Sequence, residues 1–213
     1  METERIVLIG GGGHCRSCID VIEAQGRYRI AGILDPARTG SMLGYPLLGG
    51  DELLESLLAK GISHALVTVG HVGPAPGRIL LYTRCRDLGY RLPVIIAPTA
   101  HVARSASLEP GTIVMHHAVV NSCATIGENC IINTQALVEH DARIASHCHV
   151  STAVSINGGV TIGSNSFLGS NATIAPGVSI GAEVTVGAAS LVLRDLPSGG
   201  VFVGVPARRQ LSA

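Results

Sequence analysis

The stretch from residue 126 to residue 150 reads IGENCIINTQALVEHDARIASHCHV, in which an aliphatic residue returns at every sixth position. The same period runs unbroken through sixteen positions: Val102, Leu108, Val114, Val120, Ile126, Ile132, Val138, Ile144, Val150, Ile156, Ile162, Leu168, Ile174, Ile180, Val186 and Val192. A small residue usually stands two positions earlier, and glycine often follows. A period of six fits neither a helix nor simple strand alternation. It predicts short strands joined by tight bends, with the aliphatic side chain inside, the small one at the corner, and glycine adopting backbone angles that other residues avoid.

Three hexads make one 18-residue coil of a parallel β-helix, and successive coils lie about 4.8 Å apart, the spacing of paired strands. A valine-rich β-sandwich would not keep this phase over 91 residues. Residues 18 apart therefore stack, so Ser122, His140 and Gly158 form one column, and Cys130 and Cys148 another. We interpret the two cysteines as core residues in preference to a redox pair.

The composition excludes several classes of protein. Fifteen Lys and Arg against 15 Asp and Glu give no electrostatic basis for binding nucleic acid or an anionic membrane. Apolar residues make up 46% of the 213 residues and charged residues 14%, so the chain is not disordered. No apolar run approaches the roughly 20 residues of a membrane span, and residues 6–9 are too short for an export signal. Six cysteines in such a chain predict reduced thiols and a cytoplasmic location.

The repeat region is poor in charge. Residues 102–192 contain two Arg, no Lys and five acidic residues. A surface of this kind favours packing against copies of the same chain, and three identical prisms close naturally into a ring. We therefore expect a homotrimer.

Residues 1–98 lose the period and alternate between strand and helix patterns. The expected strands span residues 5–9, 29–34, 64–69 and 92–96, and the expected helices run from the glycine run to residue 24, then over 51–60 and 77–88. Such alternation predicts an α/β domain with a parallel, doubly wound sheet. Pro93 and Pro98 mark its end, so we predict a Rossmann-like sugar-nucleotide-binding domain over 1–98 and a β-helix domain with a C-terminal tail over 99–213.

Polar groups follow the carboxyl ends of three expected strands, where ligands bind in sheets of this type. Gly10–Gly13 and His14 open a helix, whose bare N–H groups favour phosphate. Asp35 follows the second strand and can accept hydrogen bonds from a ribose or a base, and Gly70 with His71 follows the third. A dinucleotide fingerprint is incomplete, because Cys15 or Arg16 replaces its third glycine. A purely structural turn is the alternative.

Four motifs in order make the pattern more specific: Ile9 to His14, Leu34-Asp35, Val138-Glu139-His140 and the ending Gly204-Val205-Pro206-Ala207. Together with the segments 69–70, 97–100 and 133–140, they resemble the sugar O- and N-acyltransferases of the hexapeptide-repeat superfamily. This family includes sialic acid O-acetyltransferases and nucleotide-amino-sugar N-acetyltransferases. The resemblance implies an α/β N-terminal domain followed by an all-β, left-handed parallel β-helix, a trimer, and acetyl-CoA lying between two coils.

The resemblance also implies roles for individual residues. His140 matches the catalytic general base, and Asp141 matches the acidic residue that assists it, with Glu139 as the alternative. Around the coenzyme the matching residues are Asn133, His149 and Gly158; around the acceptor they are Gly12, Gly13, His14, Asp35 and Gly70. Because Gly158 stands one coil from His140, we add the hypothesis that its N–H stabilises the oxyanion of acyl transfer.

We therefore expect an acetyl-CoA-dependent N-acetyltransferase acting on a nucleotide-activated amino sugar in glycan biosynthesis. An O-acetyltransferase acting on sialic acid is the runner-up, and a non-enzymatic scaffold that binds a nucleotide sugar is the alternative from another class. A zinc hydratase needs a pair of histidines five residues apart, which the coil lacks, and Cys15 and Cys18 form a single CxxC without a second pair. We expect no metal.

Overall fold

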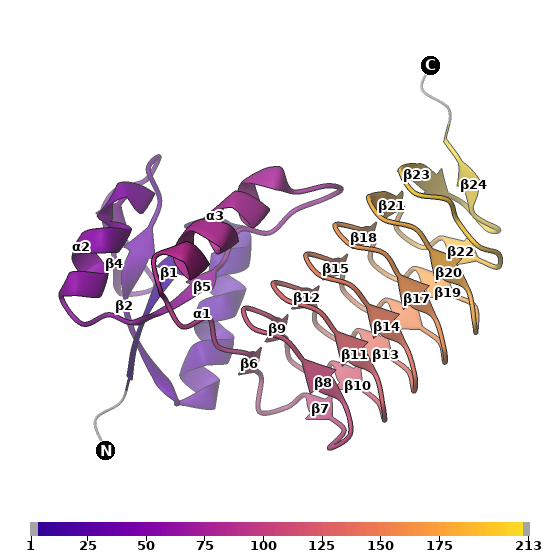
Figure 1. Ribbon diagram of the computed structural model, residues 1–213, viewed down its shortest axis with the longest axis horizontal. Helices are drawn as coiled ribbons and strands as arrows, with labels where there is room; N and C mark the ends of the chain where they lie inside the picture. Colours follow the sequence, from indigo (N-terminus) through magenta and orange to yellow (C-terminus); the bar gives the residue numbers. More distant parts are fainter. Residues whose placement is uncertain (1–3, 211–213) are drawn as a thin grey trace. The chain divides into compact units, whose positions relative to one another are not determined.

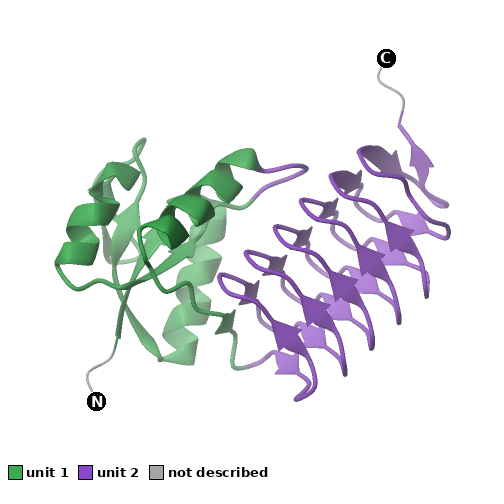
Figure 2. Ribbon diagram, viewed as in Figure 1, with its two compact units in different colours: residues 1–70, 76–98 green, residues 71–75, 99–213 purple. Residues whose placement is uncertain are grey.

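The computed structural model describes residues 4–210 and divides into two compact units (Figure 2). Unit 1 comprises the residues up to 70 together with 76–98. Unit 2 comprises 71–75 and the residues from 99 onward. Within the described residues, no helix is both long and apolar enough to cross a membrane.

Unit 1 is a five-stranded sheet with helices in its connections (Figure 1). Its strands are β1 (Glu4–Ile9), β2 (Tyr28–Leu34), β3 (Ser41–Met42), β4 (Tyr45–Gly49) and β5 (His64–Val67), in the order β3-β4-β2-β1-β5. Its helices are α1 (Gly13–Gln25), the 3₁₀ turn η1 (Asp51–Leu53), α2 (Leu54–Ala59) and α3 (Pro76–Asp87), and the two-residue strand β6 (Ile95–Ile96) follows. All sheet pairs are parallel except β3 with β4. The parallel α/β fold expected from the alternation is confirmed.

Unit 1 differs from the sequence expectation in two places. The hairpin β3–β4 was not expected; its two-residue turn, Leu43-Gly44, has positive φ at both positions, and leucine is an uncommon first residue for such a turn. The strand expected over 92–96 is only two residues long, because Pro93 has no N–H to donate to a ladder.

The core of unit 1 explains the CxxC pair. Parallel strands covered on both faces read as unbroken apolar runs, and Ile6 to Ile9 of β1 are all buried. Cys15 and Cys18 lie on the buried face of α1, and burial raises the pKa of both thiols. The two cysteines are therefore core residues of this helix.

Unit 2 is a left-handed parallel β-helix. Its coil strands are β7 (His101–Val102), β8 (Ser107–Leu108), β9 (Ile113–Val114), β10 (Val119–Val120), β11 (Thr125–Ile126), β12 (Ile131–Ile132), β13 (Leu137–Val138), β14 (Arg143–Ile144), β15 (His149–Val150), β16 (Ser155–Ile156), β17 (Thr161–Ile162), β18 (Phe167–Leu168), β19 (Thr173–Ile174), β20 (Ser179–Ile180), β21 (Val184–Val186) and β22 (Leu191–Val192). The hairpin β23 (Gly200–Val203) and β24 (Arg208–Arg209) ends the chain's described part. From β7 to β19, each strand pairs with the one 18 residues on, as Val120 does with Val138. Fourteen of the sixteen aliphatic positions are buried; Val102 and Leu108 are half-buried, because β7 and β8 are end strands.

The corners of the coil contain a second six-residue register. From Gly111 to Ala189, every sixth residue is left-handed, with φ between 54° and 74°. Most of these residues are not glycine, so the expectation that the glycine after the aliphatic residue adopts this conformation is wrong. That glycine is needed for space: a Cβ on Gly127 would lie 2.6 Å from the Ser146 amide nitrogen of the next coil. Close approach of backbones is therefore its role.

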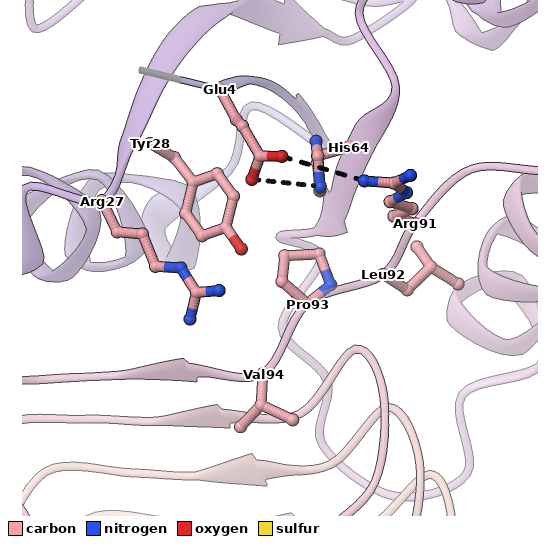
Figure 3. Close-up of a pocket in the computed structure, with 8 residues that line it drawn as sticks. All are labelled: Glu4, Arg27, Tyr28, His64, Arg91, Leu92, Pro93 and Val94. Carbon is pink, nitrogen blue, oxygen red and sulfur yellow. Dashed lines mark ion pairs between the residues drawn. The ribbon is translucent and has the colours of Figure 1, made fainter. Parts of the chain in front are cut away.

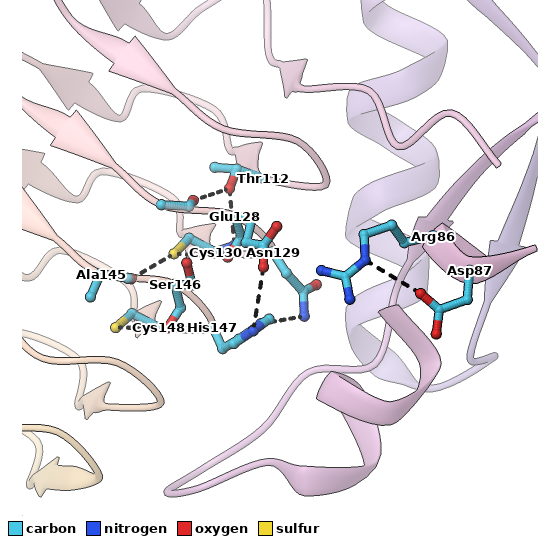
Figure 4. Close-up of polar contacts among 11 residues, drawn as sticks. Arg86, Asp87, Thr112, Glu128, Asn129, Cys130, Ala145, Ser146, His147 and Cys148 are labelled. Carbon is cyan, nitrogen blue, oxygen red and sulfur yellow. Dashed lines mark hydrogen bonds and ion pairs between the residues drawn. The ribbon is translucent and has the colours of Figure 1, made fainter. Parts of the chain in front are cut away.

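One buried corner column contains Thr112, Cys130, Cys148 and Ser166. Figure 4 shows the first three of them. Each side chain donates to the carbonyl 15 residues later, at 2.8 Å from Thr112, 3.3 Å from Cys130, 3.2 Å from Cys148 and 3.1 Å from Ser166. The two thiols thus occupy the place that hydroxyls occupy above and below them. The hydrogen bond with Cys130, together with burial, raises the pKa of the Cys148 thiol. This environment favours a structural role.

Candidate active site

His140 projects from a corner of the coil, between β13 and β14. The inward residues on either side, Val138 and Ala142, are fully buried. Asp141 takes the left-handed corner position with φ 59°. This turn directs the imidazole outward, and 64% of the His140 side chain is exposed.

The carboxylate of Asp141 holds the imidazole. Its Oδ2 lies 2.8 Å from Nδ1 of His140, whereas Oε2 of Glu139 accepts the backbone N–H of His140 at 3.1 Å. The Asp141 hydrogen bond, with a smaller contribution from the Glu139 charge, raises the pKa of His140. In the neutral ring the proton therefore stays on Nδ1, and Nε2 offers a lone pair.

Gly158 lies directly against the ring of His140, as the 18-residue column predicts. A Cβ on Gly158 would lie 2.7 Å from both Cε1 and Nε2 of the imidazole. The neighbouring amides of Asn157 and Gly159 donate to the ladder, to Ile174 and His140 carbonyls respectively. Within residues 4–210, no hydrogen bond involves the Gly158 N–H. The reactive edge of His140 thus faces a bare glycine whose amide is outside the ladder.

A second cluster joins Asn133, which directly follows β12, to His149 of the neighbouring strand β15. Asn133 Oδ1 accepts the Thr134 N–H at 2.8 Å, which turns its amide nitrogen toward Nε2 of His149 at 3.2 Å. Nε2 is therefore an acceptor, and the Nδ1–H donates to the carbonyl of His71 at 2.8 Å. The ring is buried and packs edge-on against Phe167. Both nitrogens of His149 already have partners inside unit 2.

The two clusters of the coil lie at different corners. Asn133, which follows β12, and His149 of β15 belong to one column of strands, and His140 stands beyond the following strand of its own coil. A single chain therefore brings His140, Asp141 and Gly158 together, and Asn133 and His149 together, without joining the two sets. Whether these five residues act in one site remains a prediction.

In unit 1, Asp35 organises the glycine turn. Its Oδ2 accepts the Gly11 N–H at 2.8 Å and its Oδ1 accepts the Ala37 N–H at 2.9 Å. Gly70 lies against His14, where an added Cβ would be 3.0 Å from that of His14. The ends of β1, β2 and β5 therefore bring Asp35, Gly70 and His14 to one edge of the sheet.

The amino end of α1 is bare. Gly12 caps the helix without a side-chain hydrogen bond, and the first turn contains no acidic residue. A Cβ on Gly12 or on Gly13 would meet nothing within 4 Å. The 13-residue helix thus begins without a side-chain cap and with room beside its first two glycines, an arrangement that suits an anion.

The sequence did not predict one contact and one residue near these sites. It pointed to His71 but not to the hydrogen bond between its carbonyl and His149, because the two residues stand 78 positions apart. It also missed Arg78, a buried residue of α3 whose Nη1 donates to the carbonyls of Val67 and Val69. Its only signal was a charge in a helix, which the pattern alone assigns to the surface. Among the described residues, no three His, Cys, Asp or Glu side chains converge as a metal site requires.

Comparison with family models identifies both units. Residues 5–73 match the PglD N-terminal domain, and residues 159–194 match the hexapeptide repeat of succinyl-transferase. No curated protein sequence matches the chain.

Solved structures match nearly the whole chain. GDP-perosamine N-acetyltransferase from Caulobacter crescentus, as a histidine-to-alanine mutant with CoA and GDP-perosamine, is 38% identical, covers 99% of each chain and has a TM-score of 0.94. The acetyltransferase domain of PglB from Neisseria gonorrhoeae, with acetyl coenzyme A, is 32% identical over 98% of this chain and 100% of that chain, with a TM-score of 0.92. WeeI from Acinetobacter baumannii, 20% identical with a TM-score of 0.85, covers 98% of this chain and all of that chain and shares the fold. The chain therefore belongs to the hexapeptide-repeat sugar acyltransferases, the family of the two enzymes above, and is an acetyltransferase.

Proposed function

We propose that this enzyme transfers the acetyl group of acetyl-CoA to the amino group of a nucleotide-activated amino sugar, with His140 as general base. The observation that carries the proposal is the His140–Asp141 pair, whose Nε2 edge lies over Gly158. The two relatives were solved with CoA and GDP-perosamine, or with acetyl coenzyme A, which supports this class of donor and acceptor. The scaffold alternative does not apply to an acetyltransferase.

Acetyl transfer needs a general base for the amine and a hydrogen-bond donor for the thioester oxygen. The neutral amine attacks, and its nitrogen must lose one proton as the C–N bond forms; the Nε2 lone pair of His140 accepts that proton while Asp141 stabilises the imidazolium. Acetyl-CoA supplies the thioester, whose carbonyl oxygen gains negative charge during attack. The Gly158 N–H, which is outside the ladder, suits that oxygen. His140 then returns its proton to the departing sulfur, so that protons balance.

For the acceptor, the amino end of α1 is the proposed binding site of the diphosphate. Gly12 and Gly13 leave room for phosphate oxygens at the positive end of the helix dipole. Oδ2 of Asp35 also lies 3.6 Å from Nε of Arg38, yet Oδ1 accepts only one of the two hydrogen bonds that a carboxylate oxygen can accept, and we propose Asp35 as the nucleoside contact. His14 and Gly70 complete this edge.

We further propose a homotrimer that works in the cytoplasm. His140 is largely exposed in one chain, and the Asn133–His149 pair lies at another corner. A neighbouring coil would bring such a pair to His140 and enclose the coenzyme between two prisms. All six cysteines are free thiols, which suits a reducing compartment.

The test replaces His140 with alanine. Turnover should fall by about 10²–10⁴, the range for a general base, with unchanged sedimentation. Wild type and variant are incubated with acetyl-CoA and a panel of UDP-, GDP- and dTDP-amino sugars plus sialic acid, and release of the CoA thiol is followed. His101→Ala, an exposed histidine of the first coil, is the matched control. Near-normal turnover in His140→Ala would refute the assignment, and turnover of sialic acid alone would favour O-acetylation.

A further inference from the structure

Unit 1 has a polar cavity (Figure 3), which lies at the end of its sheet opposite the glycine turn. Glu4, Tyr28 and His64 are the first residues of the parallel strands β1, β2 and β5. The glycine turn, Asp35 and Gly70 follow the other ends of the same strands. The cavity is therefore separate from the acceptor site proposed above.

The cavity has the size and lining of a small-molecule site. Its volume is about 410 Å³, within the range of roughly 300–1,000 Å³ that ligand pockets occupy. It is lined by Glu4, Arg27, Tyr28, His64, Arg91, Leu92, Pro93 and Val94. Residues 92–94 supply an apolar wall, and the two arginines supply charge.

The charges are held loosely enough to accept a ligand. Oε2 of Glu4 lies 3.5 Å from Nε2 of His64, and Oε1 lies 3.8 Å from Nη1 of Arg91, both longer than hydrogen bonds. Burial lowers the pKa of His64, so its ring is neutral near pH 7. The guanidinium groups of Arg27 and Arg91 lie on opposite sides of the cavity (Figure 3) and stand against the single carboxylate of Glu4, so the cavity retains an excess of positive charge.

The backbone of the cavity wall at Arg91 is held by hydrogen bonds. Arg91 exchanges backbone hydrogen bonds with β5, donating to Ser63 at 2.9 Å and accepting from Ala65 at 3.0 Å. Tyr28 is buried, and its ring lies 5.3 Å from that of His64 and 5.5 Å from the guanidinium carbon of Arg27. A ligand would meet arginines whose backbone and stacking positions already exist.

We propose that this cavity binds a small organic phosphate. A guanidinium group matches phosphate oxygens in geometry and charge, and the cavity offers one on each side. The volume exceeds that of a bare phosphate ion, so an organic remainder packs against residues 92–94. The Glu4 carboxylate occupies the anion position between Arg91 and His64 and competes with the incoming phosphate.

Titration calorimetry of the full chain tests this site with glucose 1-phosphate, GMP and inorganic phosphate as probes. We expect one or both organic phosphates to bind more tightly than inorganic phosphate. Arg91→Gln and Arg27→Gln should each weaken binding about tenfold or more, as loss of a charge-assisted hydrogen bond does. Glu4→Gln should tighten binding, because it removes the competing charge. Arg29→Gln, an exposed arginine of β2 outside the cavity, should change nothing.

One further variant separates this cavity from the glycine turn. Gly13→Asp places a carboxylate at the open amino end of α1 and should leave probe binding intact. The proposal is overturned if neither organic phosphate binds at millimolar concentration, if Gly13→Asp abolishes binding, if Glu4→Gln weakens it, or if both arginine variants bind as the wild type does. Unchanged acetyl transfer in Arg91→Gln keeps this result distinct from the proposed function.

Discussion

Every hexad of the coil repeats one backbone shape, whereas every connection in unit 1 is different. From Gly111 to Ala189 the corner φ varies only between 54° and 74°, so a residue's number alone tells whether it lies inside, outside or at a corner. In unit 1, His14, Asp35 and Gly70 meet because three parallel strands end at the same edge. In the coil, the place of a residue therefore follows from its position in the sequence. In unit 1 it follows only from which strands pair.

The strongest way to break the coil is a charge at an inward position. Ile162→Asp should abolish folding, because Ile162 is 1% exposed and an unpaired buried carboxylate costs several kcal/mol against a typical stability of about 5–15 kcal/mol. Circular dichroism and size-exclusion chromatography measure the loss. Thr161→Asp, on the exposed side of the same strand, should fold normally. A soluble, native-like Ile162→Asp protein would show that this register is wrong.

The same regularity explains how much of the coil could be predicted. Inward positions and the stacking of Gly158 on His140 follow from a period of six and a coil of three hexads. The role of Gly127 did not follow, because its reason is the backbone of the next coil, which a one-dimensional pattern does not contain. Nor did the pairing of His149 with His71, which depends on where residues 71–75 lie.

Unit 1 was predictable at the level of elements and less so in its contacts. Apolar runs and the glycine turn located β1, β2, β5 and α1. The hairpin turn has Leu43 where asparagine, aspartate or glycine is usual, and the buried Arg78 breaks the rule that a helical charge faces solvent. Both depend on tertiary packing, which local sequence does not express.

A smaller effect is expected from a change at the corner of the coil that contains His140. Gly158→Ala adds a Cβ 2.7 Å from Nε2 and Cε1 of His140, so the imidazole must move. Turnover should fall about 10²-fold, the effect of misplacing a catalytic group by about 1 Å, while the coil stays folded. Steady-state kinetics and thermal unfolding separate the two effects.

The neighbouring glycine provides the matched control. Gly159 has φ 67° and nothing within 4 Å of an added Cβ, and Ala153 and Ala189 take the same corner conformation. Gly159→Ala should therefore keep its activity and lose about 1 kcal/mol of stability. Equal activity losses in the two variants would contradict the contact between Gly158 and the ring.

The smallest expected effect tests which carboxylate serves His140. The Asp141 hydrogen bond raises the pKa of His140, so the protonated, inactive base persists to higher pH than for an ordinary histidine. Asp141→Asn lowers that pKa, and the acidic limb of the kcat profile should move to lower pH while maximal turnover falls about tenfold, because the base is weaker. Glu139 contacts the backbone N–H and acts on the ring through its charge alone, so Glu139→Gln should move the limb the same way but less. A larger shift in Glu139→Gln would assign the assisting role to Glu139 and contradict the assignment of that role to Asp141.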